Sequence, residues 1–115
     1  MDNKKDDRYY LQKIITDLAF IVAHTQGISQ QELEANEILV DSVMFRLIQV
    51  AENSERLTEP FKVKHSSIPW RAIKGLRNRI VHEYGNVDLK VVYDTVRQDI
   101  PALIFELKKA ENSEQ

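Results

Sequence analysis

Cysteine is absent from this chain of 115 residues, which excludes disulfide bridges, thiolate metal sites and cysteine nucleophiles. Its absence fits a reducing cytoplasm. The longest apolar run, residues 18–23, is far shorter than a membrane span. The N-terminus also lacks the apolar core of a signal peptide. We therefore expect a cytoplasmic protein that does not enter a membrane.

Sustained alternation of apolar and polar residues, which marks a half-buried strand, is also missing. Apolar residues recur instead at helical spacing, which predicts helices over 7–25, 38–57, 68–84 and from about 88 onward. We expect Gly27 to end the first of these helices in a left-handed conformation, and a capping box of Ser29 and Glu32 to begin a short helix. Pro101 lies inside the last helix, where we expect a kink or a restart.

Internal repeats, low-complexity tracts and linkers are missing too, and Pro60 with residues 64–69 marks no more than a connection between helices. We therefore expect a single domain over residues 1–115, with an ordered core at roughly 8–108. Its predicted fold is all-α, a mostly antiparallel bundle of four to five helices with short connections.

Positive charge is concentrated in one part of the chain, although the net charge is −2. Segment 62–84 holds six basic residues and one acidic residue, a local charge of +5. A basic patch attracts phosphates even on an acidic protein. The alternative is a solvated helix face whose charge is balanced by acidic neighbours in the fold.

The sequence RNRIVHEY, residues 77–84, carries the candidate chemistry. At about 100° per residue, one stripe of this helix faces the core. The residues of that stripe are Ile73, Leu76, Ile80 and Tyr84. The neighbouring sector holds Arg77, Asn78, Val81 and His82. A polar face with one apolar residue suits a partner helix, and a second copy of the chain is the simplest partner.

The residue types in this sector fit work on a phosphodiester. Histidine moves protons near neutral pH, and arginine holds a phosphate through two parallel hydrogen bonds. A phosphodiester gains negative charge in its transition state, and in RNA the 2′-hydroxyl of the substrate is a nucleophile that needs neither a metal nor a cysteine. The structural alternative is that Arg77 pairs with an acid on another helix and His82 caps backbone carbonyls.

Residues 67–103 resemble the HepT-like family of HEPN domains, which are small helical proteins. The hallmark of that family is an arginine, four to six residues, a histidine and often a tyrosine two residues further on. Arg77, His82 and Tyr84 match this hallmark, and the VDL and DIP runs that follow match the usual downstream sequence.

The resemblance extends over roughly residues 8–107. Upstream, Asp41, Arg46 and Glu52 fit the central helix of the family. Ala51 and Asn53 depart from the glycine and alanine that usually flank the glutamate. No role is therefore carried over to Glu52.

The resemblance implies a homodimer whose paired Arg/His motifs line a cleft, and a metal-independent endoribonuclease that acts as a toxin without a cofactor. His82 is then the general acid and base, Arg77 stabilises the charge of the transition state, and Asn78 orients the scissile phosphate or His82. Lys74 and Arg79 are candidates for contacts with the RNA backbone, or else belong to a solvated face.

The resemblance also implies a partner, an MntA-like minimal nucleotidyltransferase that neutralises the toxin by transferring AMP onto Tyr84. The helical wheel conflicts with this role, because it places Tyr84 on the core stripe, where its hydroxyl cannot be modified. A helix that ends at residues 83–84, next to Gly85, frees Tyr84 to turn towards the cleft. Otherwise the ring is packed, with its hydroxyl at the rim.

Two further hypotheses stay open. In the first, the chain is a non-catalytic helical partner of a nucleotidyltransferase and binds substrate or nucleotide. In the second, it is a purely structural dimer. His24 and His65 have no spaced partners for a metal site, so we expect no metal and assign both histidines structural or solvated positions. Trp70 opens the predicted helix over 68–84 and is expected to pack there, with stacking on a base as the alternative.

Overall fold

The computed structural model describes residues 5–114, and these residues form helices and turns without a strand. The long helices are α1 (Asp7–Thr25), α3 (Glu37–Glu55), α5 (Trp70–Glu83) and α7 (Ile100–Ser113). The short helices are α2 (Gln30–Glu34), α4 (Glu59–Lys64) and α6 (Leu89–Asp94). A 3₁₀ turn, η1 (Tyr84–Asn86), follows α5, and a π-helical segment, η2 (Thr95–Asp99), precedes α7. The predicted all-α bundle is confirmed.

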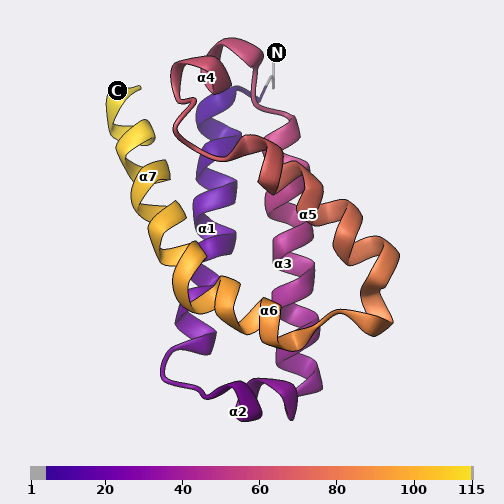
Figure 1. Ribbon diagram of the computed structural model, residues 1–115. Helices are drawn as coiled ribbons and strands as arrows, with labels where there is room; N and C mark the ends of the chain where they lie inside the picture. The colour runs from indigo at the N-terminus through magenta and orange to yellow at the C-terminus, as the bar shows by residue number, and fades with distance from the viewer. Residues whose placement is uncertain (1–4, 115) are drawn as a thin grey trace.

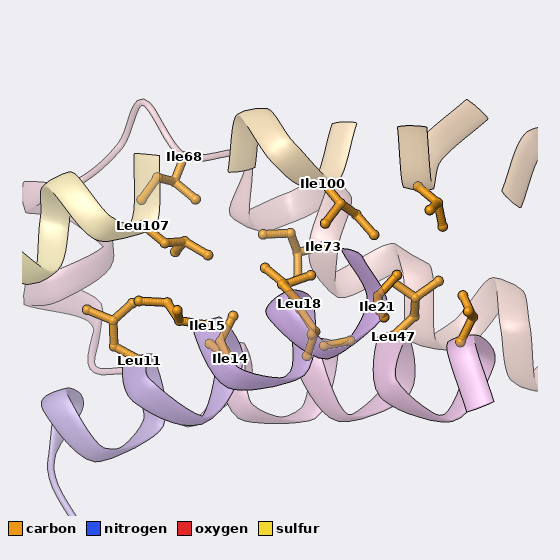
Figure 2. Packing of buried hydrophobic residues seen from close by; sticks show 14 of the residues in the cluster. Leu11, Ile14, Ile15, Leu18, Ile21, Leu47, Ile68, Ile73, Ile100 and Leu107 are labelled. Carbon is orange, nitrogen blue, oxygen red and sulfur yellow. The ribbon is translucent and has the colours of Figure 1, made fainter. Parts of the chain in front are cut away.

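The long helices pack as neighbours around one apolar core (Figure 1). Helix α1 packs against both α3 and α7, and α3 packs against α5. Side chains of all four helices meet in the core (Figure 2), among them Leu11, Leu18 and Ile21 of α1, Leu47 of α3, Ile73 of α5 and Leu107 of α7. Each such side chain stabilises the fold by about 1.5–3 kcal/mol relative to an exposed position. The core thereby holds α5 against α3.

The connection between α1 and α2 forms as the local sequence predicts. Helix α1 has the predicted bounds, and Gly27 follows it with a φ of 77°. Ser29 Oγ then accepts a hydrogen bond from the backbone N–H of Glu32 at 3.1 Å. The Glu32 carboxylate accepts one from the backbone N–H of Ser29 at 2.8 Å. This capping box begins α2.

The prediction that the segment around Pro60 is only a connection is wrong, because this segment forms helix α4. The hydroxyl of Thr58 caps this helix and Pro60 lies in its first turn, where a missing N–H costs nothing. Helix α5 begins at Trp70 and not at residue 68. The reason is steric, since Ile68 precedes Pro69 and a residue before proline is disfavoured in helical conformation.

The C-terminal helix is interrupted where Pro101 predicts a kink or restart. Helix α6 gives way to η2, and α7 begins at Ile100 with Pro101 in its first turn. Proline has no N–H to continue the hydrogen-bond ladder, and the wider π turn accommodates that loss. None of the helices in the described part of the chain is long and apolar enough to cross a membrane.

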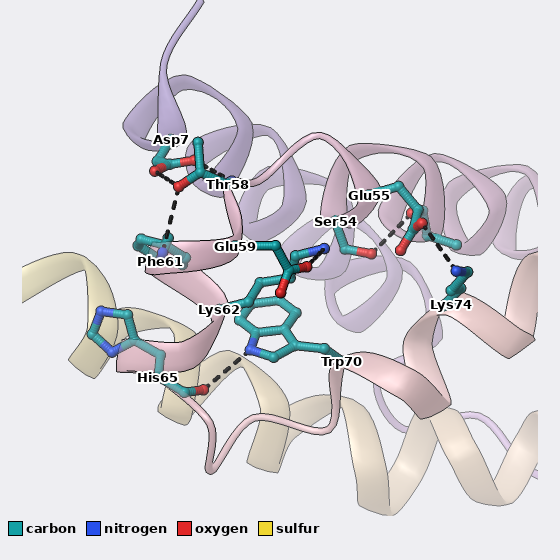
Figure 3. A network of polar contacts seen from close by, with 11 residues as sticks. Asp7, Ser54, Glu55, Thr58, Glu59, Phe61, Lys62, His65, Trp70 and Lys74 are labelled. Carbon is teal, nitrogen blue, oxygen red and sulfur yellow. Dashed lines mark hydrogen bonds and ion pairs between the residues drawn. The ribbon is translucent and has the colours of Figure 1, made fainter.

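The start of α5 is fixed by polar and aromatic contacts (Figure 3). The indole Nε1 of Trp70 donates to the backbone carbonyl of His65 at 3.1 Å, and its ring lies 6.2 Å from that of Phe61. One turn later, Lys74 forms an ion pair of 3.6 Å with Glu55 of α3. Trp70 therefore packs where α5 begins, as predicted, and orients the helix that carries the candidate site.

Candidate active site

The motif residues occupy the C-terminal half of α5 and point away from the core. Arg77, Asn78 and His82 are exposed, and Val81 between them is 46% exposed. Ile73 and Ile80, on the predicted core stripe, are buried. The predicted polar sector beside the core is therefore confirmed as a surface of the folded chain.

Arg77 is turned towards α3. Its Nε donates to the Glu52 carboxylate at 3.1 Å, and its Nη1 donates to the Asn78 side-chain oxygen at 3.4 Å. The side chains of Arg77 and Glu52 are 46% and 43% exposed. An exposed pair of this kind contributes only about 0.2–1 kcal/mol, so an incoming phosphate needs little free energy to displace Glu52.

His82 faces a different direction from Arg77. Five residues along a helix correspond to a rotation of about 140° and a rise of about 7.5 Å. Within residues 5–114 the imidazole of His82 makes no hydrogen bond, to Arg77 or to a backbone carbonyl. The ring is therefore open to solvent and substrate, and a single chain does not bring His82 and Arg77 together.

Tyr84 departs from the position given by the helical wheel. Helix α5 ends at Glu83, whose φ of −119° and ψ of 19° are no longer helical. The following 3₁₀ turn re-aims Tyr84, which is 47% exposed instead of buried on the core face. The wheel is wrong here because it extends a constant 100° step past the end of the helix. The early helix end, the alternative that frees Tyr84, is confirmed.

The exposed hydroxyl of Tyr84 has a defined partner. It donates a hydrogen bond of 2.5 Å to the Asp41 carboxylate in the second turn of α3. This hydrogen bond, followed by partial burial and the negative charge of Asp41, raises the pKa of Tyr84 above its ordinary value. The cause is that the ionised phenolate loses the bond and faces a carboxylate.

The Asp41→Ala variant should lower the pKa of Tyr84 back towards the ordinary range of tyrosine. Both the acceptor and the negative charge disappear in this variant, so the phenolate forms at lower pH. An NMR titration of the ¹³Cζ resonances of tyrosine measures the shift, with Tyr84→Phe assigning the signal. A pKa for Tyr84 that is the same in wild type and Asp41→Ala would contradict the hydrogen bond.

Acidic residues of α3 line the seam with α5, and sequence reasoning missed this role. Glu55 meets Lys74, Glu52 meets Arg77 and Asp41 meets Tyr84, so the two helices run antiparallel. Part of the signal was present in the sequence. The separation of Glu52 from Glu55 equals that of Lys74 from Arg77, which is the pattern that paired antiparallel helices produce.

The two predicted RNA contacts lie in different surroundings. Lys74 is exposed and paired with Glu55. Arg79 is exposed and lines a groove of about 570 Å³ between α5 and α7, together with Asp99 and Glu106. Arg79 is thus on the far side of α5 from Arg77. Four of the six basic residues of segment 62–84 form ion pairs, namely Lys62 with Glu59, Lys64 with Glu114, Lys74 with Glu55 and Arg77 with Glu52. The alternative of a solvated face balanced by acidic neighbours is therefore realised for most of the patch.

The other two histidines have structural partners. The His24 ring stacks on Phe20 with centroids 4.0 Å apart, and His65 Nε2 lies 2.9 Å from a Glu114 carboxylate oxygen. Bonds from His65 and from Lys64 hold the pKa of Glu114 below its usual range. Across residues 5–114, His, Asp and Glu side chains nowhere gather in a group of three or more able to hold a metal ion.

Comparison with known proteins covers nearly the whole chain. A family model described as "Ribonuclease HepT-like" matches residues 14–110. A protein of Caldanaerobacter subterraneus subsp. tengcongensis named "putative RNase" is 30% identical over 91% of this chain and 94% of its own length. A "probable ribonuclease HepT" of Thermococcus cleftensis is 29% identical over 92% of this chain and 96% of its own. No solved structure matches the chain significantly.

Proposed function

Because the chain belongs to the HepT-like ribonuclease family, we propose that it is a metal-independent endoribonuclease that acts as the toxin of a toxin–antitoxin system. The observation that carries this proposal is the family match over residues 14–110, combined with the exposure of Arg77, Asn78 and His82 on the side of α5 that faces away from the core. The residue types of that face fit the chemistry of RNA cleavage.

In the proposed reaction the 2′-hydroxyl of the RNA attacks the adjacent phosphorus and the 5′-oxygen leaves. His82 takes and returns the protons of these oxygens, as a solvent-open imidazole is able to do. Arg77 exchanges its weak bond with Glu52 for the phosphate, and its paired donors stabilise the charge of the transition state. Asn78, already hydrogen-bonded to Arg77, orients the arginine or the phosphate.

The site is proposed to be completed by a second copy of the chain. Arg77 is hydrogen-bonded to Glu52 of α3 while His82 makes no hydrogen bond within residues 5–114, so the two groups are not held together in one chain. In the proposed isologous dimer, the His82 of each copy lies opposite the Arg77 of the other, since contacts across a two-fold axis are reciprocal. Val81, which is 46% exposed on α5, supplies apolar surface for such a contact.

Neutralisation is proposed to come from an MntA-like nucleotidyltransferase that transfers AMP onto Tyr84. The exposure of Tyr84, at 47%, supports this role because the hydroxyl is within reach of another protein. The added phosphodiester is bulky and negative. It would occupy the surface next to the motif and compete for Arg77, which blocks the approach of RNA.

A second candidate function is a non-catalytic partner of such a nucleotidyltransferase. The contact between Arg77 and Glu52 favours it, because a phosphate-binding arginine is occupied by a carboxylate in the folded chain. The weak pairing of two half-exposed groups limits this objection. The two functions differ in whether bound RNA is cut.

Purified protein incubated with RNA in EDTA tests the proposed function. We expect cleavage that persists in the chelator and that ceases on RNA carrying 2′-O-methyl groups, since the nucleophile is then blocked. Binding without cleavage would favour the second candidate. Cleavage that needs an added metal ion would contradict the proposal.

A further inference from the structure

The carboxylate of Asp41 and the hydroxyl of Tyr84 are brought together by the fold alone. The residues are 43 positions apart in the chain, and the phenol donates to the carboxylate at 2.5 Å. Asp41 is itself exposed, and no other hydrogen bond or ion pair engages its side chain within residues 5–114. A solvent-facing phenol with a dedicated carboxylate acceptor is the arrangement of a nucleophile and its base.

The electrostatics of this contact bear on how the phenol can react. A neutral phenol is a weak nucleophile until its proton leaves. The neighbouring carboxylate disfavours a free phenolate and raises the pKa of Tyr84, so the ion does not form in advance. The phenol therefore needs a proton acceptor when it reacts, and the group already hydrogen-bonded to it is the Asp41 carboxylate.

We propose that Asp41 is the general base for nucleotidyl transfer onto Tyr84, an inference that rests on the proposed modification of this tyrosine. The Tyr84 oxygen attacks the α-phosphorus of a nucleoside triphosphate, and the bond from that phosphorus to the bridging oxygen of pyrophosphate breaks. Pyrophosphate leaves with the electron pair. The phenolic proton passes to Asp41, which later releases it to solvent. The modified chain thus supplies the base for its own inactivation.

The surface beside Asp41 offers room for the nucleotide. A pocket of about 370 Å³ adjoins the carboxylate, and it is lined by Phe20, Ile38, Asp41, Ser42, Phe45 and Arg46. Ile38 is 81% exposed and gives an apolar surface for a nucleobase. The pocket lies on α1 and α3, and it is connected to Tyr84 through Asp41, the carboxylate that accepts the phenolic hydrogen bond.

The experiment uses the complete chain, an MntA-like nucleotidyltransferase and ATP. The rate of AMP addition is followed by intact mass for wild type, Tyr84→Phe, Asp41→Asn and Glu83→Gln. Asparagine still accepts the phenolic hydrogen bond but takes no proton, so Asp41→Asn separates orientation from base catalysis. Glu83→Gln is the matched control, because this carboxylate adjoins Tyr84 in sequence and is exposed.

We expect Asp41→Asn to lower kcat for AMP addition by about 10²–10⁴-fold, the usual contribution of a general base. KM for the chain as substrate and its thermal unfolding stay near wild type, Glu83→Gln is modified at the wild-type rate, and Tyr84→Phe gains no mass. If wild type is not modified at Tyr84, the proposed modification fails together with this inference. If wild type is modified and Asp41→Asn keeps its kcat, or loses only KM, Asp41 is not the base while the modification stands.

Discussion

Replacing His82 by alanine should slow RNA cleavage severely. We expect kcat to fall by about 10²–10⁴-fold, because no other side chain of the motif can take and return protons near neutral pH. Binding of RNA should change much less, since the phosphate is held by Arg77. Cleavage of a fluorescent RNA in EDTA measures the first effect, and filter binding of 2′-O-methyl RNA measures the second.

The His82→Ala variant is expected to fold normally. The imidazole is exposed and makes no hydrogen bond within residues 5–114, so its loss breaks no polar contact and removes little packing. His24→Ala is the matched control, because it removes an exposed imidazole that stacks on Phe20 of α1, away from the motif. Full cleavage by His82→Ala, or an equal loss in His24→Ala, would contradict the role assigned to His82.

Replacing Arg77 by alanine should lower kcat by about 10²–10³-fold, the loss typical for removal of a group that stabilises a developing oxyanion. Arg77→Lys should recover only part of this loss, because an ammonium keeps the charge but not the two parallel donors. The measurement is the cleavage rate at saturating RNA, because at saturation a change in rate no longer reflects a change in RNA affinity.

Two further variants separate Arg77 from the charge of the surrounding patch. Arg79→Ala removes the same charge from the groove side of α5 and should weaken RNA binding modestly at most. Glu52→Gln removes the carboxylate that holds Arg77, and an exposed pair of this strength changes RNA affinity by about fivefold or less. A loss in Arg79→Ala as large as in Arg77→Ala would indicate a general electrostatic effect.

Features that depend on residues close together in the sequence were predicted more accurately than features that depend on distant residues. Helix α1 and the Ser29–Glu32 capping box depend on residues a few positions apart, and both were predicted. The exposed sector of Arg77, Asn78 and His82 also followed from local periodicity. Helix α4 was missed because Pro60 was interpreted as a break, although proline is accommodated in a first turn.

The failure at Tyr84 has a specific cause. Periodicity applies only while the backbone stays helical, and Glu83 is where it stops. Gly85 indicated that the helix could end there, but it carries no information on where the next side chain points. The direction of Tyr84 depends on a 3₁₀ turn and on an acceptor from another helix.

The sequence by itself determined the all-α class, the exposed motif and the family, because each depends on residue order along single helices or on similarity along the chain. The tertiary structure decided the partners of the motif, namely Glu52 for Arg77 and Asp41 for Tyr84. These pairs depend on the antiparallel register of α3 and α5, which the packing of side chains such as Leu47 and Ile73 sets. No local pattern specifies that register, so the environment of the Tyr84 hydroxyl becomes defined only when the core forms.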